Sequence, residues 1–161
     1  MIELNLKNKK GKINIKSNDV KGILGLRPDF EYIQDISQTI KQENIMVYDC
    51  QLSREIFNID EIEEIKEEIG QDIDDSYFDI LFEDVRAYLK DATDEIEHEI
   101  QDKYLLDNVR CHFNVYNIEE TFTDFKFVFL VSFKDIKIAS LNNLSKLIGK
   151  RQLKGASKFY S

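Results

Sequence analysis

Three short patterns in this sequence have the residue types of metal or catalytic sites. In the first, the stretch from Asp72 to Glu83 places side-chain oxygens at positions 1, 3, 5 and 12 of a loop like that of a calcium-binding EF-hand. However, Tyr77 stands where the sharp turn of such a loop requires glycine, and Asp79 stands where an apolar residue belongs. The departures fall at the positions that shape the loop, so we expect no calcium site.

The second pattern surrounds a histidine. Glu95 and His98 have the Glu-x-x-His spacing of di-iron helical bundles, which need a second such motif. His112, the only other histidine, falls on an expected strand. Asp94, His98 and Asp102 share one face of an expected helix and could hold zinc weakly. We favour an exposed histidine among acids and predict no metal site.

The third pattern has the residue types of PD-(D/E)xK nucleases, in which carboxylates hold Mg²⁺ and a lysine assists. It combines Pro28–Asp29 with either Asp124–Lys126 or Asp135–Lys137. The two halves lie too far apart in the sequence, and an acidic chain is poorly suited to cutting DNA. GxSxG, HExxH, P-loop and GxGxxG motifs are absent. We therefore expect no enzyme, no catalytic residues and no cofactor.

The dominant feature of the sequence is its acid. Between Glu55 and Asp102, nineteen Asp or Glu residues stand against Lys66, Arg86 and Lys90, a net charge of −16 in 48 residues of a chain that totals −9. In a helix roughly 42 Å long, ten acids give about one negative charge per 4 Å, close to the roughly 3.4 Å spacing along one DNA strand. This density is typical either of a solvated surface or of one that meets a basic protein.

We expect the outer sides of two acidic helices to form the partner-binding surface, with a basic nucleic-acid-binding protein as partner. The candidate residues are Asp60, Glu63, Glu64 and Glu67 on the shorter helix and Asp79, Glu83, Asp84, Asp91, Asp94, Glu95, Glu97 and Asp102 on the longer one. Direct binding to nucleic acid or to an anionic membrane is opposed by the excess of negative charge.

The helices that must position these acids are indicated by apolar periodicity. Asp60 to Gly70 is predicted as a short helix and Asp75 to Asp102 as a long one that Asp91–Asp94 could interrupt. Other predicted helices cover Phe30–Ile40 and Ser140–Gly149, while 18–26 is predicted as a turn or a single helical turn.

Predicted strands form hairpins, one over residues 2–15 and one from Val109–Tyr116 and Asp124–Phe133, the latter at the centre of the sheet. Ile45–Asp49 and Leu52–Phe57 are predicted as two further short strands. Val128 and Leu130 indicate that the Phe-rich strand is covered on both sides; left uncovered, its second face would form a homodimer surface.

These elements predict one α+β domain over residues 1–149, an antiparallel sheet built from hairpins with helices, including the long acidic one, on one face. Residues 150–161 are expected to form a basic, flexible tail. No apolar run reaches the roughly 18 residues of a membrane span, and the N-terminus lacks a signal-peptide core. Cys50 and Cys111, far apart, are expected to be reduced thiols of a cytoplasmic protein.

A short, acidic, single-domain chain without enzyme motifs resembles the phage-encoded anti-CRISPR proteins in size, charge and composition. The resemblance implies inhibition of a CRISPR effector nuclease inside a bacterial host cell, and it assigns no residue because these proteins share no motif. Two alternatives fit the same features: an immunity protein that neutralises a nuclease toxin, and a phage structural or assembly protein with a merely solvated acidic face.

Overall fold

The computed structural model describes residues 1–40, 42–53, 75–118 and 125–160, with side chains described over the same ranges except 75–81, 118 and 155–160. The predicted helix from Asp60 to Gly70, with the candidate residues Asp60, Glu63, Glu64 and Glu67, lies outside these ranges. Within them, no helix is both long enough and apolar enough to cross a membrane.

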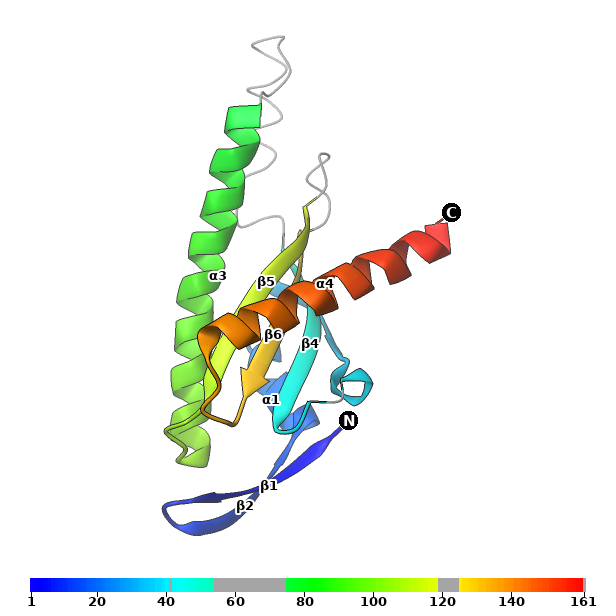
Figure 1. Cartoon of the computed structure of the whole chain (residues 1–161). Coiled ribbons are helices and arrows are strands. Elements are labelled where there is room, and N and C mark those ends of the chain that lie inside the picture. Colours follow the sequence, from blue (N-terminus) through cyan, green and yellow to red (C-terminus); the bar gives the residue numbers. More distant parts are fainter. Residues whose placement is uncertain (41, 54–74, 119–124, 161) are drawn as a thin grey trace.

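The described elements comprise a two-stranded hairpin, a four-stranded antiparallel sheet and helices that flank it (Figure 1). The hairpin is β1 (Glu3–Asn8) and β2 (Gly11–Lys16). The sheet has the order β3-β4-β6-β5, with β3 at Phe30–Asp35, β4 at Ile45–Leu52, β5 at Arg110–Ile118 and β6 at Phe125–Ser132. The helices are α1 (Ser17–Gly25), the 3₁₀ turn η1 (Ser37–Thr39), α3 (Asp75–Tyr104) and α4 (Ile138–Tyr160).

The α+β class is confirmed, but helices cover both faces of the sheet rather than one. Phe127 and Phe129 of β6 pack on the side of α1 and α3, whereas Val128 and Leu130 pack with Leu141 of α4. Figure 1 shows α4 crossing the sheet with α3 along its side. Because successive side chains of a strand point to opposite faces, a strand that is apolar at each position from Phe127 to Val131 needs cover on both faces. The condition for a homodimer surface on this strand is therefore not met.

The long helix is confirmed and runs without a break through Asp91–Asp94. Its buried side chains form one stripe facing the core: Val85, Leu89, Ala92, Ile96 and Ile100. The β5–β6 hairpin pairing is also confirmed, but β5 is an edge strand, and β4 rather than β5 shares the centre with β6. The hairpin β1–β2 is confirmed as a separate small sheet.

The prediction of a helix over Phe30–Ile40 is wrong, because these residues form β3 and the turn η1. A bulge between Phe30 and Tyr32 shifts the register of β3 against β4. Phe30 and Ile33 consequently reach the same core although they are three residues apart, a spacing typical of a helix.

Three further boundaries differ from the predictions. Residues 17–25 form a complete helix instead of a turn, and Ile45–Leu52 form one strand without the predicted break after Asp49. Residues 54–57 of the second predicted strand lie outside the described ranges. The prediction that the last helix ends at Gly149 is also wrong, since residues 150–160 continue α4 rather than starting a loose tail. Gly149 is buried, and a Cβ at this position would lie 2.9 Å from Cβ of Tyr116, so this glycine allows α4 to approach β5 closely.

Candidate partner-binding surface

The candidate acids of α3 lie on a single helix that its buried stripe fixes against the core. Asp79 belongs to this helix, but its side chain is outside the described part. The described candidates divide into exposed side chains and one that is half-buried. Exposed are Glu83, Asp84, Asp91, Asp94, Glu95 and Asp102, and half-buried is Glu97.

The structure separates these acids into two flanks. At about 100° per residue, Asp84, Asp91 and Asp102 fall on one side of the buried stripe. Glu83, Asp94 and Glu97 fall on the other side, where they line two cavities beside β5. The first flank, which we call the outer flank, spans roughly 27 Å from Asp84 to Asp102 at 1.5 Å per residue.

The carboxylates of the outer flank are not paired with cations among the described residues. Glu95, which lies on the same side of the buried stripe, does form an ion pair with Arg27 at 2.9 Å, and this pair ties α3 to the segment that follows α1. Within the described ranges, Asp84, Asp91 and Asp102 take part in no ion pair. These three carboxylates therefore present unneutralised negative charge to the solvent.

Glu97 has a different task. Its carboxylate accepts a hydrogen bond from the backbone N–H of Cys111 at 2.8 Å, and Gln101 donates to the carbonyl oxygen of Val109 at 3.1 Å. Both backbone groups belong to the start of β5 and its approach, on the free side of an edge strand. Glu97 thus holds the sheet edge, and we leave it out of the partner-binding surface.

Most side chains of the EF-hand-like stretch from Asp72 to Glu83 lie outside the described part. The described residues of the other two patterns do not assemble into a site. Nδ1 of His98 lies 2.7 Å from the backbone oxygen of Asp94, and the described residues contain no group of three potential metal ligands. The carboxylate of Asp29 accepts a hydrogen bond from the Tyr88 hydroxyl, and that of Asp135 pairs with Arg110 at 3.2 Å. The carboxylates at 29 and 135 are thus engaged separately, and Asp124 lies outside the described ranges.

Both thiols are free, as expected from their distance in the sequence. Burial raises the pKa of Cys50 and of Cys111 well above the ordinary value, and the nearby carboxylates Asp49 and Glu97 add to the effect. Because the thiolate is the reactive form, neither cysteine is suited to act as a nucleophile.

The chain was compared with family models, with curated proteins and with solved structures, and none of the three comparisons gives a match. Its surface chemistry is therefore the basis for a functional proposal. That chemistry is electrostatic: carboxylates fixed on a rigid helix can attract and orient cationic groups.

Sequence reasoning missed a groove that carries the opposite charge. A cavity of about 520 Å³ lies between α3, the edge of β5 and α4. It is lined by Glu83, Arg86, Ala87, Lys90, His112, Phe113, Asn114, Val115, Asn142 and Lys146. One feature of the sequence could have indicated it. Arg86 and Lys90 are two of only three basic residues in the acidic segment, and their spacing of four residues places them on one helix face.

Proposed function

We propose that this protein is a non-enzymatic inhibitor whose acidic helix occupies a basic nucleic-acid-binding site of another protein. The most specific form of the proposal is an anti-CRISPR protein that binds a CRISPR effector nuclease in the cytoplasm of the bacterial host cell. The observation that carries it is the outer flank of α3, where Asp84, Asp91 and Asp102 are exposed without a cation within the described ranges.

The carboxylates of the outer flank are held in fixed positions because α3 is anchored to the rest of the protein. Five buried side chains hold the opposite side of α3, and the Arg27–Glu95 ion pair fixes the helix laterally. Carboxylates on such a support need little reordering when they meet lysine and arginine side chains, so less conformational entropy is lost on binding. A row of negative charge along a rod also resembles the phosphates of one nucleic-acid strand, which a nuclease channel is built to hold.

The experiment measures inhibition of purified nucleases. DNA cleavage by CRISPR effector nucleases of several types, and by a bacterial nuclease toxin, is followed with increasing concentrations of the protein. The test variant is Asp84→Lys with Asp91→Lys and Asp102→Lys. The control variant, Asp19→Lys with Glu31→Lys and Glu43→Lys, makes the same charge change at exposed positions outside α3.

We expect wild type and control to inhibit a CRISPR nuclease equally and the outer-flank variant to be at least about tenfold weaker, because close charge pairs couple strongly. Inhibition should also weaken between about 50 mM and 200 mM salt. Inhibition of the toxin alone would support an immunity protein instead. An outer-flank variant as potent as wild type would contradict the proposal, and so would a lack of inhibition across the panel.

A further inference from the structure

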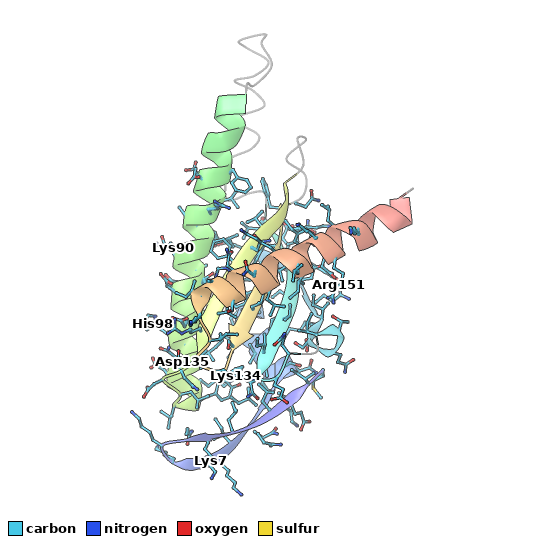
Figure 2. All side chains as sticks on the ribbon, in the orientation of Figure 1. Lys7, Lys90, His98, Lys134, Asp135 and Arg151 are labelled. Carbon is cyan, nitrogen blue, oxygen red and sulfur yellow. The ribbon has the colours of Figure 1, made fainter. Side chains whose placement is uncertain are left out.

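The groove between α3, β5 and α4 gathers positive charge on an otherwise acidic protein. Arg86 and Lys90 extend from α3, and Lys146 extends from α4 on the other side. Figure 2 shows Lys90 partway along α3. Among the described residues that line the groove, Glu83 is the only carboxylate. On a protein with a net charge of −9, the described lining of this groove thus holds more cations than acids.

These cations do not serve to neutralise the acids around them. Within the described ranges, Arg86, Lys90 and Lys146 form no ion pair, although acids flank Arg86 and Lys90 in the sequence. The guanidinium of Arg86 instead lies 4.8 Å from the centre of the Phe82 ring. Arg86 and Lys90 are four residues apart on one helix face, an arrangement that destabilises a helix when both residues carry the same charge. An anion bound between them would relieve this repulsion.

We propose that this groove binds a small phosphate-bearing molecule, an activity separate from the proposed inhibition of a nuclease. The phosphate would lie between Arg86, Lys90 and Lys146, since the fork of a guanidinium matches two phosphate oxygens and lysines add compact charge. Three cations suit a doubly charged phosphate better than a single carboxylate. The volume of about 520 Å³ lies in the range of sites for small ligands, large enough for a nucleotide.

The remaining lining residues can hold the rest of such a molecule. Phe113 and Val115 offer apolar surface, and Asn114 and Asn142 offer amide groups. Nε2 of His112 is buried and has no hydrogen-bond partner within the described ranges. Burial lowers the pKa of His112, and the neighbouring side chain of Asn142 acts in the opposite direction. A neutral imidazole leaves Arg86, Lys90 and Lys146 as the source of positive charge in the groove.

The neighbouring surface limits the length of the ligand. A second cavity, of about 570 Å³, shares His112 with the groove and is lined by Asp94, Glu97, Asp107 and Asp135. Arg110 also lines this cavity and pairs with Asp135, and Lys9 pairs with Asp107, but Asp94 and Glu97 form no ion pair within the described ranges. A polyanion that continued from the groove along β5 would be repelled by these two carboxylates. The ligand should therefore end within the groove, as a free phosphate or a nucleotide would.

Isothermal titration calorimetry with the full chain tests the proposal. The probes are inorganic phosphate, AMP, ATP, a single-stranded oligonucleotide and succinate as a dicarboxylate. The groove variant combines Arg86→Gln, Lys90→Gln and Lys146→Gln, and its control combines Lys7→Gln, Lys21→Gln and Lys137→Gln, which remove the same charge at exposed positions elsewhere. Thermal melting verifies that both variants are folded.

We expect saturable binding of phosphate, AMP or ATP, unchanged in the control and weakened roughly tenfold or more in the groove variant, as lost charged hydrogen bonds require. Amide NMR signals of Phe113 to Val115 should shift on titration. If inorganic phosphate binds as tightly as AMP, the ligand is a simple anion.

The proposal fails if no phosphate compound binds, if the groove variant binds as well as the control, or if succinate or the oligonucleotide binds more tightly than ATP. The outer-flank variant should bind the ligand normally, so this test and that of nuclease inhibition fail independently.

Discussion

The carboxylate of Glu97 on α3 accepts a hydrogen bond from the backbone N–H of Cys111 on β5, at a distance of 2.8 Å. One helical turn later, Gln101 donates to the backbone oxygen of Val109. An edge strand exposes such groups to pairing with other chains unless something covers them. The acidic helix thus closes the beginning of β5 with its own side chains, and one of its acids belongs to the architecture.

Replacing Glu97 by alanine should destabilise the protein by about 1–3 kcal/mol, because the N–H of Cys111 loses its acceptor. Glu97→Gln keeps an acceptor oxygen and should recover most of the loss. Glu99→Ala, an exposed position on the same helix, should change stability by less than about 0.5 kcal/mol. Urea denaturation measures all three, and equal losses for Glu97→Ala and Glu99→Ala would contradict the assignment.

Gly149→Ala should destabilise the protein by about 1–3 kcal/mol, although alanine is the better helix former. Its Cβ would lie 2.9 Å from Cβ of Tyr116 and 3.0 Å from Nδ2 of Asn114. Gly22→Ala on α1 meets nothing within 4 Å and should stabilise by up to about 1 kcal/mol. The opposite signs, measured by thermal melting, test whether α4 lies as close to β5 as described.

Leu130→Ala should cost about 2–5 kcal/mol of stability, because Leu130 is fully buried between β6 and α4. Leu147→Ala is the matched control, since Leu147 lies on α4 itself but is 65% exposed. It should be nearly neutral. If Leu130→Ala melts like wild type, α4 does not cover this face of the sheet.

Asp35 should make stability depend on acid pH. Burial alone would raise the pKa of Asp35, but hydrogen bonds from the Ser17 hydroxyl and from the backbone N–H of Ser37 outweigh it and lower the pKa. A lowered pKa in the folded state means that the ionised group stabilises the fold above the unfolded-state pKa of about 3.9. This stabilisation is lost as the pH falls through the folded-state pKa.

Asp35→Asn should therefore be less stable than wild type at neutral pH, and the difference should shrink as the pH falls below about 4. Denaturation at a series of pH values gives the two curves. Glu31→Gln, which removes a charge at an exposed position of the same strand, controls for net charge. A constant difference between Asp35→Asn and wild type at all pH values would show that ionisation of Asp35 is not involved.

Repulsion along α3 predicts a salt effect on stability. At physiological ionic strength the Debye length is about 8 Å, so sodium chloride weakens repulsion between exposed charges that lie farther apart than this. The melting temperature of wild type should therefore rise with salt. The variant Asp84→Lys, Asp91→Lys, Asp102→Lys should show a smaller rise, because its lysines already relieve the repulsion. If the melting temperatures of the two proteins rise equally with salt, repulsion among the carboxylates of the outer flank does not measurably lower stability.

The sequence predicted elements whose apolar period is unambiguous. Ile96 and Ile100 belong to a sustained helical stripe, and Phe127 and Phe129 belong to a strict alternation, so α3 and β6 could be predicted. β3 could not be predicted, because the bulge after Phe30 gives the buried residues of this strand the spacing that is typical of a helix. Gly149 looked like a helix stop, since only the contact with Tyr116 reveals its other purpose.

The candidate surface was predictable only as a set of acids. The sequence assigned Glu97 and Asp91 to the same outward side, and a helical projection cannot show which flank faces a neighbour. The position of β5 decides this, and it depends on strand order, which local periodicity does not contain. The groove was missed for the same reason: Lys146 joins Arg86 only through the packing of α4 across the sheet.

Leu52 on β4 lies directly opposite Phe125 on β6. The chain therefore departs from the central ladder and rejoins it at one point, and the whole acidic stretch lies between departure and return. Lengthening a segment whose ends are already held together adds little entropic cost, roughly 0.6 kcal/mol for each doubling. The pairing of β4 with β6 thus fixes both ends of a segment that also contributes α3 and β5 to the fold. Selection can alter the charge of this segment's outward side, provided that its apolar stripe still fits the sheet.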